Sequence, residues 1–393
     1  MRASDFTSTR FGVLATKPLA AWPHAYFLPA PIPRELMLEP ETVAAISRAD
    51  LALGKLAGLA TLIDNPALLL GPALAQEALA SSRIEGTEAS LSEVLSAEND
   101  GFPIENENLR EVANYLRAIE QGTELIATLP LTLRFFGALH ETLLTDVRGE
   151  EKSPGELRKS PVWIGSPNAR PETARFIPPH HDDIGALLTD WERFVNEAST
   201  MPPVLRAALM HYQFETIHPF LDGNGRIGRL LIGFEFMRDE ILTAPILHIS
   251  GYFESHRSHY YDRLQAVRER GEIDEWVQFF AAAVEFQANE SAGRISTLLT
   301  IRERYRAQVR GQRSQIGDVI DVLLEHPVVT VNTVVREAQV TQPTASGLLR
   351  KAEQLGWVRS AGRWGRGGKE RWVADEIWTA VTRTHFDAEE ATP

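Results

Sequence analysis

Apolar residues recur at helical spacing over most of the first 300 positions of this 393-residue chain. Residues 41–63 hold one such run, which breaks at Asn65 and Pro66. Residues 72–86 hold a second run, with Pro72 in its first turn and Gly86 just past its end. Further amphipathic stretches cover residues 107–128, 131–145, 182–197 and 202–217. The pattern predicts a mainly α-helical body.

One insertion, residues 161–179, departs from this helical pattern. Two short apolar runs, Val162 to Gly165 and Ala174 to Ile177, flank a polar loop that contains prolines. Such an arrangement fits a β-hairpin. It fits equally well a surface loop held by a few apolar anchors, and the pattern alone does not decide between the two.

The pattern changes again after about residue 300. Three short apolar-periodic runs predict three helices, at residues 315–327, 331–339 and 342–358. Residues 357–374 then predict two strands around a turn rich in Gly and Arg. That order resembles a winged helix-turn-helix, a small α+β module in which the second helix of the pair would start near Thr344.

The composition limits the chemistry that the chain can perform. With no cysteine, it forms neither disulfides nor thiolate metal sites and has no cysteine nucleophile. No apolar window reaches the roughly 18 residues of a membrane span, and the start, MRASDFTSTRFG, lacks the apolar core of a signal peptide. We therefore expect a soluble cytoplasmic protein without a membrane partner. Its predicted regions are residues 1–100, 101–295 and 296–393.

Charge is distributed unevenly along the chain. The formal net charge of −13 argues against nucleic-acid binding by the whole molecule. Residues 301–374 nevertheless carry 13 Lys or Arg against 7 Asp or Glu, a local charge of +6 that leaves −19 for the remainder. The C-terminal region is therefore electrostatically distinct from the body.

Residues 218–230, HPFLDGNGRIGRL, concentrate the candidate chemistry. His218 follows a predicted helix that Pro219 stops, and a short loop leads to the next helix. Gly223 and Gly225 can turn backbone N–H groups inward at the N-terminus of that helix. Such an arrangement is a ready anion site.

Two arginines make an anion at this place more plausible. Arg226 and Arg229 share one face of the first helical turn, where the helix dipole disfavours positive charge unless an anion is bound. Asp222 can supply an oxygen ligand to Mg²⁺, and His218 can act as a general base near neutral pH. The set predicts phosphoryl or nucleotidyl transfer. The alternative is a structural histidine before proline and an ordinary Gly-Asn-Gly turn.

The stretch from His218 to Arg229, HPFLDGNGRIGR, resembles the HPFx[D/E]GNGRxxR signature of Fic-domain proteins at every fixed position. The resemblance continues through PGELRKSPVWIG, ARFIPP and SHYYDRLQAV, and covers roughly residues 25–290. It implies a Fic-type helical bundle with a β-hairpin flap, and it makes residues 101–295 the catalytic domain.

The resemblance also implies a protein adenylyltransferase, which moves AMP from ATP onto a Ser, Thr or Tyr hydroxyl and releases pyrophosphate. His218 would be the base and Asp222 the Mg²⁺ ligand, while the 161–179 flap would dock an extended target segment by strand addition. The nucleotide would be held by Gly223, Asn224, Gly225, Arg226, Ile227, Gly228 and Arg229. Tyr260 and Tyr261 would border the adenine, or would simply belong to the core.

A built-in brake is predicted near the end of the helix in residues 72–86. Ser81, Glu85 and Gly86 match the inhibitory [S/T]xxxE[G/N] motif of the same family. Glu85 lies at a helix C-terminus, where the dipole disfavours a carboxylate unless a cation is near, and Arg229 is the candidate cation. The resemblance implies that this pair blocks productive binding of the γ-phosphate. The alternative is an exposed glutamate at a frayed helix end.

The C-terminal region leaves other functions open. It could dock DNA, or it could serve protein interaction or dimerisation of the chain. The alternatives for the whole chain are an ATP-sensing DNA-binding regulator, an AMP-removing hydrolase that uses the same site, and transfer from a different donor. The residues expected at DNA are Thr344, Ser346 and Arg350 in a groove, with Arg363, Arg366 and Lys369 at phosphates.

Overall fold

The computed structural model describes residues 1–17, 22–61, 67–91, 93–94, 106–166, 168–312, 314–364 and 369–382. It is mainly α-helical, as the apolar spacing predicted. None of the described helices is both long enough and apolar enough to span a membrane.

The centre of the body is the helix pair α7 and α8, Pro203–Ile217 and Asn224–Arg238. Nearly every side chain of α7 is buried, because neighbouring helices pack around it on all sides. Helix α6 packs against this pair through an apolar stripe. Its residues Ile184, Leu188 and Trp191 recur at helical spacing and face the core. The helices around the central pair are α2 (Ala67–Ile84), α4 (Glu107–Leu125), α5 (Leu133–Leu143) and α6 (Ile184–Asn196).

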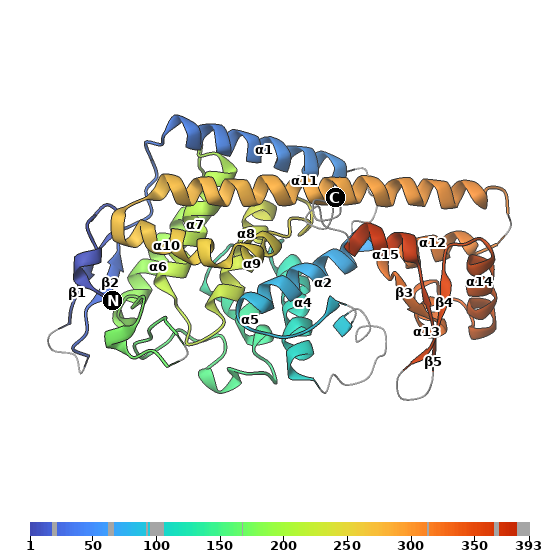
Figure 1. Ribbon diagram of the computed structural model, residues 1–393, viewed down its shortest axis with the longest axis horizontal. Coiled ribbons are helices and arrows are strands. Elements are labelled where there is room, and N and C mark those ends of the chain that lie inside the picture. The colour runs from blue at the N-terminus through green and yellow to red at the C-terminus, as the bar shows by residue number, and fades with distance from the viewer. Residues whose placement is uncertain are drawn as a thin grey trace, which may run out of the picture.

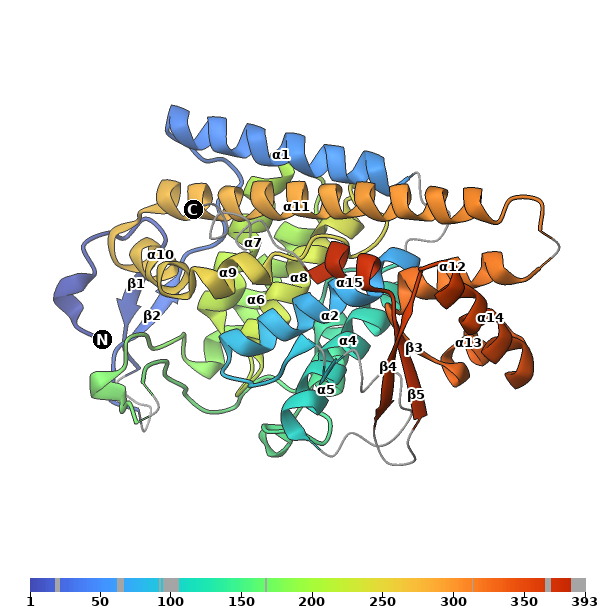
Figure 2. The same cartoon turned by 45° about the vertical axis from the view of Figure 1, so that its right-hand side comes forward.

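One helix of 36 residues, α11 (Ile273–Gln308), runs the length of the molecule and joins the body to the C-terminal region. Helix α1 (Pro40–Ala60) lies along it, as Figures 1 and 2 both show. Two shorter helices, α9 (Ser250–Ser255) and α10 (Arg257–Arg270), pack beneath α11. A small antiparallel pair, β1 (Gly12–Ala15) and β2 (Tyr26–Pro29), lies at the N-terminal end.

The C-terminal region has the element order that its sequence predicted, three helices and then a strand pair, with one short strand and one final helix added. Its antiparallel sheet has the strand order β3-β5-β4, and the wing-like pair is β4 and β5. Helix α12 contacts α2, and α15 contacts α11, so this region is docked on the body (Figure 2). The winged helix-turn-helix remains our interpretation of that order. Its elements are α12 (Ile316–Glu325), β3 (Val328–Thr330), α13 (Val331–Glu337), α14 (Gln342–Gln354), β4 (Arg359–Trp364), β5 (Lys369–Val373) and α15 (Asp375–Thr382).

Two local predictions differ from the structure. Helix α2 begins at Ala67 rather than near Pro72, because the apolar run before the proline continues the helical spacing. The expected hairpin at 161–179 is reduced to one antiparallel bridge between Ile164 and Phe176. Flanking prolines have no N–H to extend the ladder, so a loop with one bridge results. Short 3-10 turns are η1 (Ala3–Asp5), η2 (Glu150–Lys152), η3 (Pro171–Thr173) and η4 (His181–Asp183).

Candidate active site

The loop between α7 and α8 places the predicted residues in one short turn. His218 ends α7 in the left-handed conformation, with φ 51°, and its backbone N–H donates to the Phe214 carbonyl at 2.9 Å. Gly223, with φ 72°, is the N-cap of α8. Asn224 fastens the loop, because its amide accepts from the Phe220 N–H at 2.8 Å and donates to the Phe220 carbonyl at 2.9 Å. The Asn224 amide therefore shapes the loop, and any effect on a ligand passes through the backbone.

The imidazole of His218 is held in its neutral form. Its Nδ1 atom is buried and has no hydrogen-bond partner among the described residues. Burial lowers the pKa of His218 to about 4, and the positive charges of Arg158 and Arg268 act in the same direction. A neutral imidazole at neutral pH can accept a proton, as the role of general base requires.

Arg158, which the sequence pattern did not single out, binds the backbone at the start of the loop between α7 and α8. The side chain is 3% exposed, and its Nε donates to the His218 carbonyl at 2.8 Å. Its NH2 group donates to the carbonyls of Pro179 and Ile217. Arg158 therefore ties the end of α7 to the segment after the 161–179 loop. The only sequence signal for it was its place within PGELRKS, a stretch already quoted for the family resemblance.

Arg226 is the most unusual side chain of the site. It is fully buried, and none of its three guanidinium nitrogens has a hydrogen-bond partner in the described part of the chain. The nearest carboxylates, Glu111 and Asp222, lie 3.9 and 3.8 Å away. Burying a guanidinium without hydrogen bonds costs folding free energy, unless a bound ligand accepts those hydrogen bonds. The first turn of α8 therefore presents unused donors to an anion.

Asp222 stands beside this guanidinium as an ionised carboxylate. Burial alone would raise its pKa, but the ammonium group of Lys152, with Nζ 2.8 Å from Oδ2, and the Gly223 N–H hold that pKa below its usual range. Its other contact is with the His140 ring, whose Nε2 lies 2.9 Å from the Asp222 carbonyl oxygen. A half-buried carboxylate that already holds a cation fits Mg²⁺, which needs only one or two protein oxygens and keeps most of its waters.

Arg229 is paired with Glu85, as the sequence predicted. Glu85 Oε1 accepts from NH2 of Arg229 at 2.9 Å, across 144 positions of sequence. Ser81 orients the same guanidinium, because its hydroxyl accepts from Nε at 2.8 Å and its carbonyl accepts from NH2 at 2.9 Å. Burial would raise the pKa of Glu85, but the charge of Arg229 lowers it overall, so the carboxylate is ionised.

The Glu85 carboxylate also occupies the space over the start of α8. A Cβ atom at Gly225 would come within 2.3 Å of Glu85 Oε1, so only glycine leaves room for that oxygen. Gly86 follows in the left-handed conformation, with φ 97°, and turns the chain away from α2. Glu85 thus lies where an anion approaching the N-terminus of α8 would lie.

Several of the expected nucleotide contacts face elsewhere. Ile227 is wholly buried in the core, and a Cβ at Gly228 would meet the Glu215 carboxylate at 2.3 Å, so these two residues pack rather than line the anion site. Tyr260 is also a core residue, because it is 1% exposed and its hydroxyl is 2.9 Å from Nε2 of His211. Burial and the charge of Glu85 together raise the pKa of Tyr261 to about 12, and they raise the pKa of Tyr260 too, so both tyrosines lie within electrostatic reach of the site.

A second carboxyl close to the site escaped the sequence analysis. Glu215 is buried on α7, its Oε1 has no hydrogen-bond partner in the described part of the chain, and burial raises its pKa to about 7. The sequence showed only a glutamate within a helix, and nothing in the local pattern distinguished it from an exposed one.

Comparison with known proteins finds similarity to one family. Residues 43–124 match the Fic/DOC family N-terminal region, and residues 130–235 match the Fic/DOC family. The chain is 32% identical over 210 residues to the protein adenylyltransferase Fic of Aedes aegypti, a match covering 51% of this chain and 38% of the relative. It is 34% identical over 166 residues to the protein of the same name from Drosophila melanogaster, with 42% and 30% covered. The chain thus spans less than two fifths of the length of these curated relatives.

Solved structures support the same fold. A Fic family protein from Desulfovibrio desulfuricans G20 aligns over 87% of this chain and 98% of its own, with a TM-score of 0.53 and 20% identity. Residues 134–508 of Fic-1 from C. elegans align over 66% of this chain and 75% of their own, with a TM-score of 0.51 and 20% identity. At this identity the likeness concerns the fold.

Proposed function

We propose that the chain, in which residues 43–124 and 130–235 match the Fic/DOC family N-terminal region and the Fic/DOC family, is a protein adenylyltransferase that moves AMP from ATP onto a protein hydroxyl. The observation that carries the proposal is the buried guanidinium of Arg226, which lacks hydrogen bonds in the described structure and faces the same loop as a neutral histidine. An anion cradle beside a base is what nucleotidyl transfer requires. Relatives named protein adenylyltransferase Fic support the choice of reaction.

The proposed reaction is a single displacement at phosphorus. The target hydroxyl oxygen forms a bond to the α-phosphorus of ATP, while the bond from that phosphorus to the oxygen that bridges it to the β-phosphate breaks. The hydroxyl proton passes to the imidazole of His218. Pyrophosphate leaves with the electron pair, and Arg226 and Arg229 compensate the negative charge that it carries.

Asp222 is the proposed ligand of Mg²⁺, which when bound would neutralise phosphate charge. Its carboxylate already holds the Lys152 ammonium group at 2.8 Å, so the site favours a cation before any nucleotide arrives. Lys152 is exposed enough to withdraw, with a side chain 39% accessible to solvent. Lys152 therefore helps to keep the Asp222 carboxylate ionised at the loop between α7 and α8.

Glu85 is the proposed brake on this reaction. With Glu85 on Arg229 and over Gly225, the second arginine of α8 is engaged and the space above the helix start is filled. The γ-phosphate of ATP would have to displace this carboxylate. The wild-type protein is therefore mostly inhibited, and removal of Glu85 from Arg229 activates it.

The 161–179 loop is the proposed docking place for the target. Its single bridge leaves the backbone beside Ile164 available for one added strand, and Trp163 on the same segment is 41% exposed. The loop is held to the body, because Arg158 binds the Pro179 carbonyl next to the His218 loop. A target segment that pairs here would lie close to the base.

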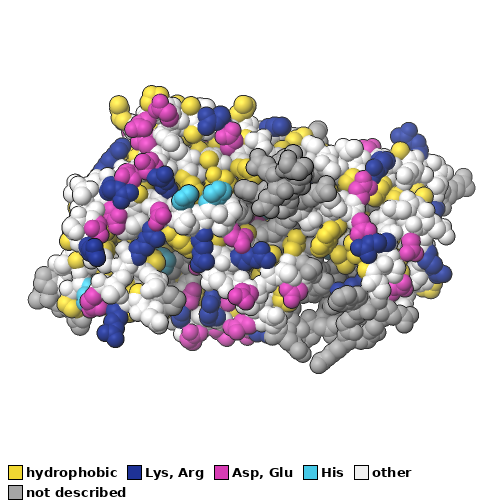
Figure 3. Space-filling view, in the orientation of Figure 1, with side chains coloured by type: hydrophobic (Ala, Val, Ile, Leu, Met, Phe, Trp, Pro, Cys, Tyr) yellow, Lys and Arg dark blue, Asp and Glu magenta, His cyan; other side chains and the backbone are white. Residues whose placement is uncertain are grey.

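The C-terminal region is a candidate for DNA or protein contact. On α14, Thr344 and Arg350 are exposed and Ser346 is half-buried, so the expected face is accessible. Arg366 lies outside the described residues, and so do the side chains of Arg363 and Lys369. Figure 3 shows Lys and Arg interspersed with Asp and Glu over the face in view, without a broad basic surface. No observation favours DNA over a protein contact or a homodimer, so adenylyl transfer is the function proposed.

The function is tested with Glu85→Gly protein, Mg²⁺ and ATP labelled at either the α- or the γ-phosphate. We expect covalent label on the enzyme itself or on proteins of an added lysate from α-labelled ATP, and none from γ-labelled ATP. This pattern separates AMP transfer from phosphorylation. Tight ATP binding without any covalent label would instead favour the ATP-sensing regulator, and release of AMP from a modified protein would favour the hydrolase.

Arg226→Met is expected to weaken ATP binding by about 10- to 100-fold, because charge-assisted hydrogen bonds to phosphate are lost. Titration calorimetry on the Glu85→Gly background measures the change. The matched control is Arg238→Met at the other end of α8, where the guanidinium binds Glu235 and Asp239 rather than the loop. Equal ATP affinity in the Arg226 variant and its parent would show that the Arg226 guanidinium does not bind a phosphate group of ATP.

A further inference from the structure

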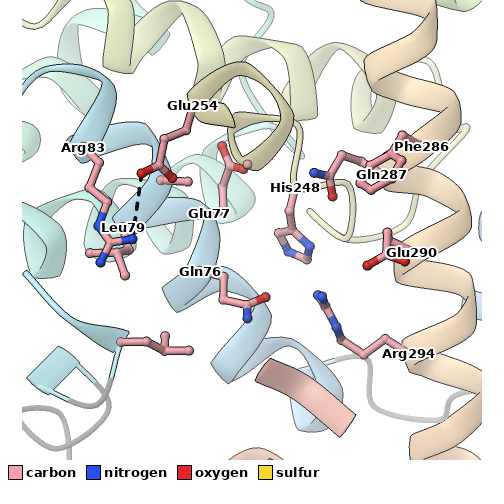
Figure 4. A pocket seen from close by; sticks show the side chains of 13 residues that line it. Gln76, Glu77, Leu79, Arg83, His248, Glu254, Phe286, Gln287, Glu290 and Arg294 are labelled. Atoms are coloured by element: carbon pink, nitrogen blue, oxygen red, sulfur yellow. Dashed lines mark ion pairs between the residues drawn. The ribbon is translucent and has the colours of Figure 1, made fainter. Parts of the chain in front are cut away.

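A cavity of about 270 Å³ lies on the side of α2 away from the active site. Gln76, Leu79, Ala80 and Arg83 line it and share one face of the helix, since they are three, four and seven positions apart. Ser81 and Glu85, which bind Arg229, lie on the opposite face. The other walls of the cavity come mainly from α9 and α11 (Figure 4). The helix that carries the brake is thus a shared wall between the anion site and this cavity.

His248 is an unsatisfied buried side chain aimed into the cavity. It is only 6% exposed, and neither ring nitrogen has a hydrogen-bond partner among the described residues. Figure 4 shows the ring pointing into the space between α2 and α11. Burial lowers the pKa of His248 to about 3, so the ring is neutral and offers one donor and one acceptor. Buried polar groups without partners are rare, and here a ligand would supply them.

Arg294 of α11 adds a cation to the same cavity. Its guanidinium makes no hydrogen bond or ion pair within the described part of the chain, and it points toward His248 in Figure 4. Burial lowers the pKa of Arg294, while the charge of Glu290, one turn earlier, opposes this shift. Arg294 is therefore a partly desolvated cation with the charge of Glu290 on the same helix, and no ion pair holds it within the described residues.

Three of the other charged side chains of the cavity are held by partners outside the Arg294 and His248 pair, while Glu290 lines the wall beside Arg294. Glu77 accepts from the Ser250 N–H at 2.9 Å and from the Tyr115 hydroxyl at 3.3 Å. Glu254 faces Arg83, with 3.8 Å between the charged atoms. The remaining wall is apolar, formed mainly by Leu79, Ala80, Leu91 and Phe286. The cavity thus combines an apolar wall with the guanidinium of Arg294, the carboxylate of Glu290 and a neutral imidazole.

We propose that this cavity is a second ligand site, which binds a small organic carboxylate through Arg294 and His248 and holds its apolar part against Leu79 and Phe286. A carboxylate has the geometry to take two guanidinium N–H groups and the charge to neutralise them. The volume accommodates one aromatic ring with its acid group.

The binding test uses titration calorimetry with benzoate, and benzamide as its neutral counterpart. Benzoate is expected to bind the wild-type protein at least about tenfold more tightly than benzamide, because only the acid neutralises Arg294. Arg294→Met should remove this preference, whereas Arg306→Met, an exposed arginine on the same helix, should keep it. Absence of benzoate binding, or equal binding of acid and amide, overturns the proposal.

A second pair of variants protects the test against misfolding. His248→Gln keeps a donor and an acceptor and should retain benzoate binding within about fivefold, while His248→Leu should lose it. Both variants remove the imidazole, so a general loss of structure would affect them alike. If the two variants bound benzoate equally well, the imidazole would have no part in the site.

The ligand is also expected to strengthen the brake, an expectation that rests on the proposed function. The cavity exists with Glu85 on Arg229, so a ligand that fills it favours this arrangement of α2. Benzoate should therefore slow AMP transfer by the wild-type protein about fivefold or more. It should not slow transfer by Glu85→Gly, which has no brake. Equal inhibition of both proteins overturns the coupling, while absence of transfer from both contradicts the proposed function and leaves the calorimetric result standing.

Discussion

Glu85→Gly is expected to raise AMP transfer by about 10- to 100-fold, within the range by which coupled sites typically change each other's affinity. The substitution removes the carboxylate from Arg229 and opens the space over Gly225. Arg229 should keep its orientation, because Ser81 still binds it through a hydroxyl and a carbonyl at 2.8 and 2.9 Å. The rate of self-labelling from α-labelled ATP measures the effect.

The control for this variant is Glu88→Gly, three positions later. Glu88 is exposed, so its substitution introduces the same backbone freedom without touching Arg229. Glu85→Gln provides a second comparison, since it keeps the size of the side chain but removes its charge. A rate in Glu88→Gly that matched Glu85→Gly would show that local flexibility of the chain, and not loss of the ion pair, causes activation.

His218→Ala on the Glu85→Gly background is expected to lower the transfer rate by about 10²- to 10⁴-fold, the usual contribution of a general base. ATP affinity should stay within about twofold, because the imidazole accepts the hydroxyl proton and is not needed to hold phosphate. Transfer under single-turnover conditions and ATP binding by calorimetry measure the two quantities separately. A large loss of ATP affinity would assign His218 to binding instead.

The pH profile gives an independent check on the same residue. The structure lowers the pKa of His218 to about 4, chiefly by burial, and Glu85 opposes this shift. Removal of Glu85 therefore lowers that pKa further, and the base stays deprotonated over a wider range. Transfer by Glu85→Gly should be flat from about pH 8 down to about pH 5 and fall only below that. An acid limb near pH 6.5 would show a solvated histidine that burial does not perturb.

The pairing of Glu85 with Arg229 illustrates how far sequence reasoning could reach. The helix end and the Glu85 carboxylate beside it were visible in the sequence, but Arg229, 144 positions away, was only a candidate partner until the family resemblance favoured the pair. The structure confirms the contact. Inhibition by that contact stays a prediction, because a short distance between two charges does not measure a rate.

The two tyrosines show the opposite case. Tyr260 and Tyr261 are adjacent, and the sequence offered no way to tell which one faces the site. Neighbouring positions of a helix point about 100° apart, so only the packing of α10 against α7 and α11 decides. That packing buries Tyr260 against His211 and leaves Tyr261 partly exposed, while burial and the charge of Glu85 raise the pKa of both. For residues 161–179 the sequence left a hairpin and an anchored loop open, and the structure shows a loop with one antiparallel bridge, because the flanking prolines could not extend it.

The sequence by itself determined what is local in this protein: the helices, the turn from His218 to Gly223, and the order of elements in the C-terminal region. These follow from the spacing of apolar residues, from proline and glycine, and from hydrogen bonds within a few positions. Only the tertiary structure decided which distant groups meet, such as Lys152 on Asp222 and the cavity between α2 and α11. Such contacts depend on how whole helices pack, and local spacing carries no information about them.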